Sequence, residues 1–118
     1  MQHSSGFRKI CDDAKKEVSQ ITLEETQAKQ ASGEELILID VREDNEWDKE
    51  HLPNAIHIGK GVIERDIEKT VPDQSAMLVL YCGGGSRSAL AALNLQKMGY
   101  TNVHSMIGGF RGWKATQG

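Results

Sequence analysis

Apolar residues are concentrated in four short runs, at 36–40, 55–58, 77–81 and 103–106, and polar or glycine-rich segments separate them. The first run is apolar until it ends in Asp40, which is typical of a strand covered on both faces in a parallel sheet. The run at 77–81 is the most apolar in the chain, and Cys82 follows it directly. These patterns predict four strands.

Apolar residues at helical spacing predict helices before and between these strands. Residues 1–19 favour an amphipathic helix, and an irregular extension is the alternative. Thr22 and Glu25 match a capping box, which predicts a helix to about Ala31 that stops at Gly33. A helix therefore precedes the first predicted strand.

The second half of the chain repeats this alternation. A short helix is expected over 44–50, where Asp44 can cap the first turn, and a longer one over 62–71. Another is expected to begin near residue 86, and Gly99 can end it. The last aromatic segment is expected to be broken up by three glycines: Gly108, Gly109 and Gly112.

This alternation predicts an α/β fold, in which a central, mostly parallel sheet carries helices on both faces. A length of 118 residues suits a single core. We expect an N-terminal helix or extension at 1–19 and one domain at 20–118. In such folds ligands bind outside the carboxyl ends of the strands, where Asp40 and Cys82 are predicted to lie.

Charge and hydropathy narrow the functional class. Fourteen basic and seventeen acidic residues are interspersed and give a net charge of -3, which argues against nucleic acid or an anionic membrane as partner. No run approaches the roughly 18 apolar residues of a membrane span, and the first residues do not resemble an export signal. We therefore expect a cytoplasmic protein, in which the two cysteines stay reduced.

The segment 82–88, Cys-Gly-Gly-Gly-Ser-Arg-Ser, carries the most distinctive chemistry. Gly83, Gly84 and Gly85 can turn the chain sharply and leave their N–H groups pointing into one concavity. A helix that begins near Ser86 adds unpaired N–H groups on the same side. Such a loop can stabilise a thiolate at Cys82 without a histidine base, and the thiolate could carry sulfur as a persulfide.

Several motifs in a fixed order resemble the rhodanese family. The segment from Cys82 to Arg87 matches the family's C-x-x-G-x-R loop, and four other stretches agree with it: 40–42, 46–55, the strand before Cys82, and 108–113. The resemblance covers roughly residues 20–116. Two departures, Glu50 and Asn54, stand where the family often has glycine, and both lie away from the cysteine loop.

The resemblance implies a thiosulfate sulfurtransferase. A sulfane donor such as thiosulfate, or a persulfide, would leave one sulfur on Cys82, and cyanide, a thiol or a protein acceptor would remove it. Gly83 to Ser88 would bind the donor, and Arg87 would brace the loop by pairing with Glu46 or Asp40. No metal or organic cofactor is implied. The physiological donor and acceptor are not determined by the residues.

Two rival functions use a similar loop. The first is a rhodanese-like persulfide relay or partner-binding module with little turnover of thiosulfate, since Gly83 and Gly84 place no charge beside the nucleophile. The second is a cysteine phosphatase or arsenate reductase. Those enzymes place arginine six positions after cysteine, whereas Arg87 is five positions after Cys82 and Ser88 occupies the sixth.

The remaining candidates have a structural and a functional interpretation each. Ser86 and Ser88 could donate to a bound anion or cap the helix. Asp40 could orient the loop or cap a turn, and Arg42 could add positive potential at the entrance. Cys11 is expected to be an incidental surface thiol, or to resolve the persulfide as a disulfide. No spacing among the four histidines suggests a metal site.

Overall fold

The computed structural model describes residues 3–117. Its centre is a five-stranded sheet in the order β1-β5-β4-β2-β3, and every neighbouring pair of strands is parallel. The strands are β1 (Ser19–Ile21), β2 (Ile37–Asp40), β3 (Ala55–His57), β4 (Leu78–Tyr81) and β5 (Val103–Met106). The predicted α/β class with a parallel sheet is confirmed.

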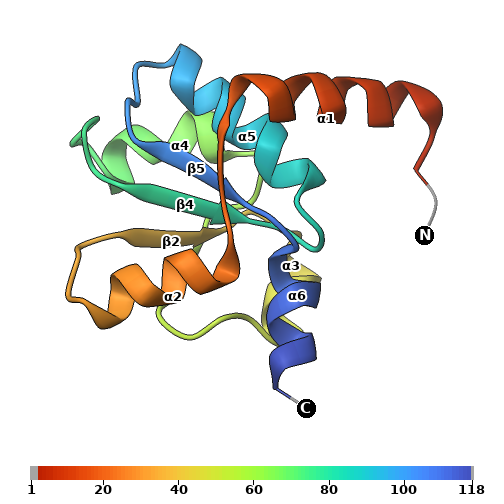
Figure 1. Cartoon of the computed structure of the whole chain (residues 1–118). Helices are drawn as coiled ribbons and strands as arrows, with labels where there is room; N and C mark the ends of the chain where they lie inside the picture. The colour runs from red at the N-terminus through yellow and green to blue at the C-terminus, as the bar shows by residue number, and fades with distance from the viewer. Residues whose placement is uncertain (1–2, 118) are drawn as a thin grey trace.

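Within residues 3–117, four helices connect successive strands, one precedes β1 and one follows β5, and together they cover both faces of the sheet (Figure 1). Three of them, α1 (Ser5–Glu17), α4 (Ile63–Thr70) and α5 (Ser86–Lys97), lie on one face. The other face carries α2 (Leu23–Ala31), α3 (Asp44–Lys49) and α6 (Gly109–Thr116). The layers therefore agree with the expectation from the alternating pattern.

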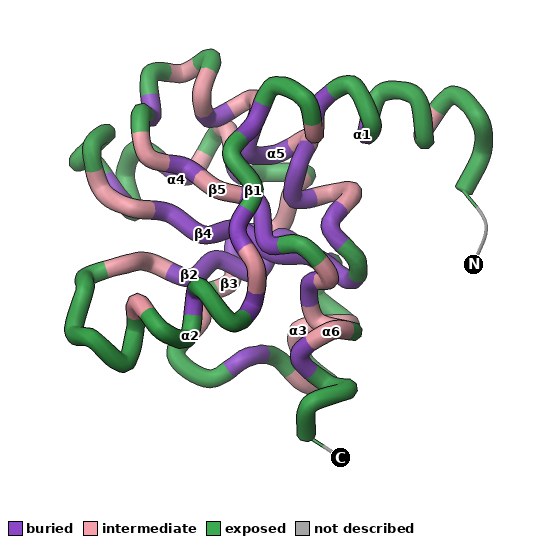
Figure 2. The backbone as a smooth tube through the Cα atoms, in the orientation of Figure 1, coloured by how far each residue is buried: buried purple, intermediate pink, exposed green. Residues whose placement is uncertain are grey.

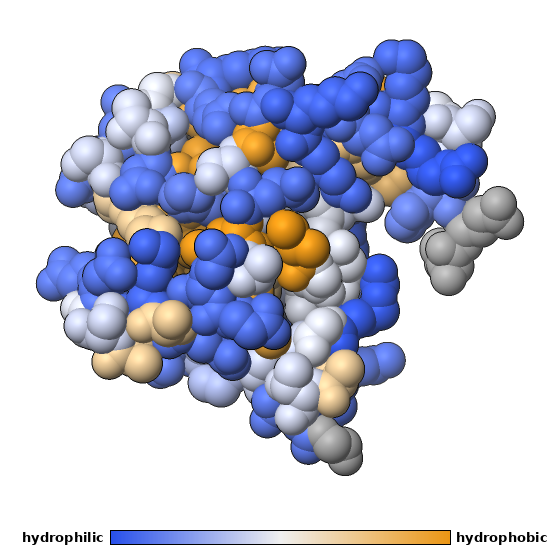
Figure 3. Space-filling model, in the orientation of Figure 1, coloured by the Kyte–Doolittle hydropathy of each residue, from blue (hydrophilic) through white to orange (hydrophobic). Residues whose placement is uncertain are grey.

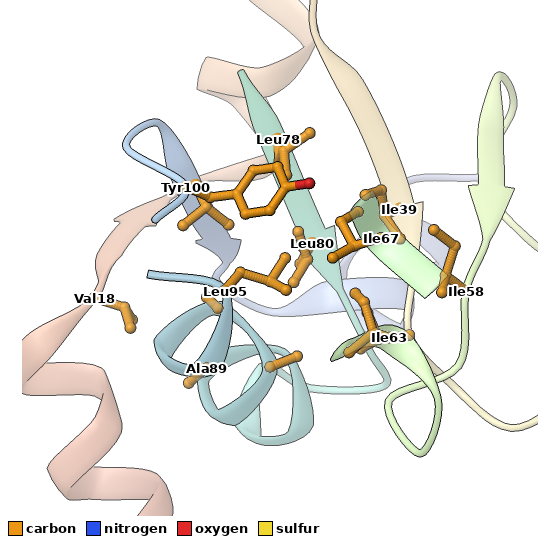
Figure 4. Close-up of a cluster of buried hydrophobic side chains, with 14 of the residues drawn as sticks. Val18, Ile39, Ile58, Ile63, Ile67, Leu78, Leu80, Ala89, Leu95 and Tyr100 are labelled. Carbon is orange, nitrogen blue, oxygen red and sulfur yellow. The ribbon is translucent and has the colours of Figure 1, made fainter. Parts of the chain in front are cut away.

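Strand β4 lies in the middle of the sheet and is buried along its whole length, because helices cover both of its faces. Leu78 and Leu80 face the α5 side, where they join the larger apolar cluster (Figure 4). Cys82 belongs to the same cluster. Val79 and Tyr81 face the opposite cluster. This alternation turns the Cys82 side chain towards α5, which begins four residues later.

Most predicted elements lie where the pattern placed them. Thr22 accepts from the Glu25 N–H and Glu25 accepts from the Thr22 N–H, so the capping box of α2 is confirmed. The cap of α3 was misassigned, because Glu43 and not Asp44 is its N-cap. The Glu43 N–H donates to the Glu46 carboxylate, and the Glu46 N–H donates to the Glu43 carbonyl, so Asp44 lies in the first turn.

Two elements at the edges differ from expectation. Strand β1 was not predicted, because its three residues are mostly polar and it is a strand only through its pairing with β5. The glycine-rich end is a helix, α6, and not a broken segment. Phe110 and Trp113 pack against the apolar cluster of that face, so tertiary packing outweighs the low helix propensity of glycine.

Helix α1 lies along α5, and its exposed outer side contrasts with a buried inner side (Figure 2). Cys11 and Ala14 are 2% and 1% exposed on that inner side. The expectation that Cys11 is a surface thiol is wrong, because the amphipathic helix turns it inward. The division into a segment at 1–19 and a domain at 20–118 stays a prediction.

The surface seen in Figure 3 is mainly hydrophilic, and apolar atoms emerge in small areas between the helical layers. Large apolar side chains that are exposed are scattered: Ile10, Ile56, Val62 and Ile107. Among residues 3–117, no helix has the length and apolar character needed to cross a membrane.

Candidate active site

Cys82 lies between the end of β4 and the start of α5, at the carboxyl edge of the central strand. Its side chain is almost completely buried, and only 1% of the residue is exposed. The Gly85 N–H donates to Cys82 Sγ over 3.1 Å, and the Ser88 N–H does so over 3.4 Å. The loop thus folds back so that backbone donors converge on the sulfur.

Glycine is required at Gly85, which caps α5 in the left-handed conformation with a φ of 108°. Helix α6 holds the outer side of the loop, because the Phe110 N–H donates to the Cys82 carbonyl over 2.7 Å. The Arg111 N–H donates to the Gly83 carbonyl over 3.1 Å. With these carbonyls turned towards α6, the loop N–H groups are free to face the sulfur.

Gly109 permits this contact between α6 and the loop. Its φ is 52°, and a Cβ at this position would overlap the Cys82 carbonyl. The three glycines near the chain end therefore do not break the last segment. Gly109 allows the start of a helix to approach the cysteine loop closely.

A chain of two buried hydroxyls continues from the sulfur. Ser88 Oγ lies 3.5 Å from Cys82 Sγ and 2.7 Å from Ser105 Oγ on β5. Both serines are 0% exposed. If the Ser88 hydroxyl donates to a thiolate, it can accept from Ser105, so both hydroxyls are satisfied. Ser86, by contrast, is the first residue of α5 and not its N-cap, which is Gly85.

Two opposing effects act on the pKa of Cys82. Burial raises it, because a thiolate loses solvation, whereas hydrogen bonds from the Ser88 hydroxyl and from loop N–H groups lower it. The hydrogen bonds prevail, and the pKa of Cys82 lies below that of an ordinary cysteine. The site therefore favours a thiolate, which is the nucleophilic form of cysteine.

Arg87 points from the loop towards α3. Its guanidinium donates to both carboxylate oxygens of Glu46, over 2.8 and 3.2 Å. This is one of the two pairs expected from the sequence, and it links the cysteine loop to the opposite layer. The hydrogen bonds from Arg87 hold the pKa of Glu46 below its usual range. Arg87 is thus largely neutralised by its partner.

Asp40 and Arg42 lie outside the loop. Arg42 donates to both oxygens of Asp40, and the two side chains are 5% and 0% exposed. Arg42 also donates to the Glu50 carbonyl over 2.7 Å and stacks on Phe110. Arg42 is paired with Asp40 and, among residues 3–117, does not line the pocket beside Cys82, so a contribution of Arg42 to the positive potential at the entrance stays a prediction.

A second arginine, Arg111 of α6, was missed as a site residue. Its guanidinium lies over Gly83 and Gly84, where a Cβ on Gly84 would overlap it. Arg111 lies in the stretch 108–113 that resembles the rhodanese family, and no local pattern places it beside Cys82. Only the contact between α6 and the loop brings the two together.

A pocket of about 370 Å³ opens beside Cys82. One wall consists of loop residues, a second is Arg111, and the third comes from α1 and the residues just before it. Its lining is His3, Ser4, Phe7, Cys82, Gly84, Ser86, Arg87 and Arg111. The pocket therefore combines a buried sulfur, cationic groups and an aromatic ring, and can hold an anion next to a nucleophilic thiolate.

Comparison with known proteins identifies similar sequences. Residues 22–116 match the family described as rhodanese-like domain. Thiosulfate sulfurtransferase GlpE of Coxiella burnetii is 33% identical over 81 residues, which cover 69% of this chain and 74% of that protein. GlpE of Pseudomonas savastanoi is 35% identical over 100 residues, covering 85% and 91%.

YrkF of Bacillus subtilis, named as a candidate sulfur carrier protein, is 32% identical over 96 residues. The match covers 81% of this chain and 51% of YrkF, so the chain spans about half the length of that relative.

Solved structures share the fold over most of the chain. A protein of unknown function from Rhodopseudomonas palustris, described as a possible tyrosine phosphatase, superposes with a TM-score of 0.84 at 28% identity. That match covers 100% of this chain and 96% of the other. A rhodanese-like domain protein from Staphylococcus aureus gives 0.73 at 26% identity, covering 80% and 90%.

Proposed function

The chain belongs to the rhodanese-like domain family, and its relatives support a sulfurtransferase activity; from this premise we propose that it transfers a sulfane sulfur through a persulfide on Cys82. The observation that carries the proposal is the convergence of backbone and hydroxyl donors on the buried Cys82 sulfur. Such a cradle stabilises a thiolate and, after transfer, an anionic persulfide.

The proposed reaction has two displacement steps. The Cys82 thiolate attacks the outer sulfur of thiosulfate, the S–S bond of the donor breaks, and its electron pair leaves with sulfite. Cys82 then carries a persulfide. In the second step cyanide or a thiolate attacks the outer sulfur, takes it as thiocyanate or as a new persulfide, and the Cys82 thiolate is restored.

The start of α5 is suited to hold the transferred sulfur. As in the first turn of any helix, the Ser86 and Arg87 N–H groups have no helical carbonyl as partner. Within residues 3–117 no backbone carbonyl outside the helix accepts from them either. These N–H groups, with the positive end of the helix dipole, can receive the negative charge of the outer sulfur. Arg87, paired with Glu46, braces the loop.

A persulfide relay with little turnover of thiosulfate is the second candidate. The name of YrkF, a candidate sulfur carrier, supports it. Gly83 and Gly84 carry no charge, so a dianionic donor would depend on loop amides and on Arg111. Under this alternative Cys82 still accepts sulfur, but it receives it from another persulfide and passes it to a protein or small thiol.

Phosphate hydrolysis is the weaker proposal, although one structural neighbour is described as a possible tyrosine phosphatase. Within residues 3–117, the lining of the Cys82 pocket includes no carboxylic acid that could protonate a leaving group. The loop arginine, Arg87, is already paired with Glu46. Sulfur transfer needs neither an acid nor a free loop arginine.

The proposal is tested by intact mass after incubation with thiosulfate. Wild type should gain one sulfur atom and lose it as thiocyanate when cyanide is added. Cys82→Ser should gain none, whereas Cys11→Ala, a matched change at the other buried cysteine, should behave as wild type. Sulfur added to Cys82→Ser would refute the assignment. A wild type that accepts sulfur from a persulfide but not from thiosulfate would support the relay.

We also propose that the protein works in a reducing compartment such as the cytoplasm, because the cycle needs a free thiol at Cys82. Both Cys11 and Cys82 are free thiols in the structure. Location in cells, measured by fractionation, would test this proposal separately.

A further inference from the structure

The wall that α1 adds to the Cys82 pocket lies outside the part of the chain that matches the family. The match begins at residue 22, whereas α1 spans Ser5–Glu17. Nevertheless Phe7 of α1 lines the same pocket as Cys82. The helix is held in place by Cys11 and Ala14, which are buried against the domain. The pocket is thus completed by an element that the family resemblance does not describe.

Phe7 presents an aromatic surface to this pocket. It is only partly buried, and its ring meets the His3 ring in an edge-to-face arrangement, with 4.9 Å between the centroids. The next large apolar residue of the helix, Ile10, is 52% exposed and lines a different groove. Phe7 is therefore the apolar side chain of α1 that a guest beside Cys82 would meet.

Arg111 supplies the positive charge that is not neutralised. In residues 3–117 no carboxylate lies within ion-pair distance of its guanidinium, whereas Arg87 is paired with Glu46 and Arg42 with Asp40. Gly83 and Gly84 leave room for Arg111 above the loop. An anionic group in the pocket would therefore meet Arg111 as its available cation.

The size of the pocket also favours a guest larger than thiosulfate. Its volume of about 370 Å³ is within the range of sites for small organic molecules, roughly 300–1,000 Å³. A five-atom inorganic anion would fill only a small part of this volume. A guest with an apolar body and one anionic head would contact both the ring and the arginine.

Resting on the proposed function, we infer that Phe7 and Arg111 determine donor specificity: Arg111 binds the anionic head and Phe7 the apolar body of an organic sulfane-sulfur donor. For a thiosulfonate, the Cys82 thiolate attacks the outer sulfur, the bond to the sulfonyl sulfur breaks, and its electron pair leaves with the sulfinate. Arg111 contacts the sulfonyl oxygens throughout, and the organic group lies against Phe7.

The test compares two donors of equal charge and the same reacting group, benzenethiosulfonate and methanethiosulfonate, with cyanide as acceptor. For each variant we measure the ratio of the kcat/KM values of the two donors and compare it with the ratio in wild type. The intrinsic reactivities of the donors are the same for every variant, so they cancel in this comparison. Phe7→Ala should lower the benzene-to-methane ratio about tenfold, the loss of one good aromatic contact. Phe7→Leu should lower it less. Ile10→Ala, on the same helix but outside the pocket, should leave the ratio unchanged.

Arg111→Gln separates the two roles. It should raise KM for both donors about tenfold, as expected for losing a charge-assisted hydrogen bond, and leave their ratio unchanged. A ratio that is the same in wild type, Phe7→Ala and Phe7→Leu overturns the role of Phe7, and unchanged KM values in Arg111→Gln overturn that of Arg111. If neither donor nor thiosulfate loads sulfur on wild-type Cys82, the proposed function itself fails, and this inference with it.

Discussion

Replacement of Ser88 by alanine tests how the loop stabilises the thiolate. The change removes the hydroxyl that lies 3.5 Å from Cys82 Sγ but keeps the Ser88 N–H. Alanine is a good helix former, so α5 should be retained. Because burial alone raises the pKa of Cys82, each lost donor should move the pKa upward.

The expected shift follows from the geometry. A hydrogen bond to a charged group contributes about 1.5–3 kcal/mol, and the long distance here favours the lower value. One pKa unit corresponds to about 1.4 kcal/mol, so Ser88→Ala should raise the pKa of Cys82 by about one unit. At a pH below both pKa values, alkylation of Cys82 should then be about tenfold slower.

The assay is the rate of iodoacetamide alkylation as a function of pH, in a Cys11→Ala background so that only Cys82 reacts. Ser105→Ala is the matched control, because it also breaks the Ser88–Ser105 hydrogen bond but leaves the Ser88 hydroxyl beside the sulfur. It should move the inflection less. An inflection that stays in place in Ser88→Ala, or moves equally in both variants, would show that the Ser88 hydroxyl does not lower the pKa of Cys82.

Two further predictions concern stability. Glu46→Gln breaks the pair with Arg87, and because both side chains are about a third exposed, we expect a loss of only about 0.5–1 kcal/mol in urea unfolding. Arg87 lowers the pKa of Glu46, so this contribution is present above the usual glutamate pKa and should vanish as the pH falls through the lowered value. Gly109→Ala should cost about 2–3 kcal/mol, because its φ is 52° and its Cβ would overlap the Cys82 carbonyl. Gly112→Ala, in the same helix with open space around its Cβ position, should instead stabilise by about 0.5–1 kcal/mol, and equal effects of the two changes in thermal unfolding would contradict this account.

The cysteine loop could be predicted because its information is local. An apolar strand, three glycines and a helical pattern occupy consecutive residues, and together they place Cys82 between β4 and α5. The sequence offered Glu46 and Asp40 as partners of Arg87. In the structure Arg87 pairs with Glu46, because Asp40 is already paired with Arg42. Local chemistry thus limited the partners, and packing selected one.

Residues contributed by other segments could not be predicted in the same way. Ser105, Arg111 and Phe7 come from β5, α6 and α1, and none belongs to a local pattern that marks a site. Cys11 was misjudged for a related reason. Helical spacing showed that the segment is amphipathic, but its burial depends on the contact between α1 and α5.

Hydrophobic periodicity, capping and turn chemistry act over a few neighbouring residues, so the residues alone predicted the parallel sheet, most of its strands and helices, and the thiol loop. The strand order, the helical state of residues 109–116 and the walls of the pocket around Cys82 became known only from the folded chain. These features depend on contacts between segments that are distant in the sequence. The free energy of those contacts outweighs the local conformational preferences of the residues only once the sheet and its covering helices have formed.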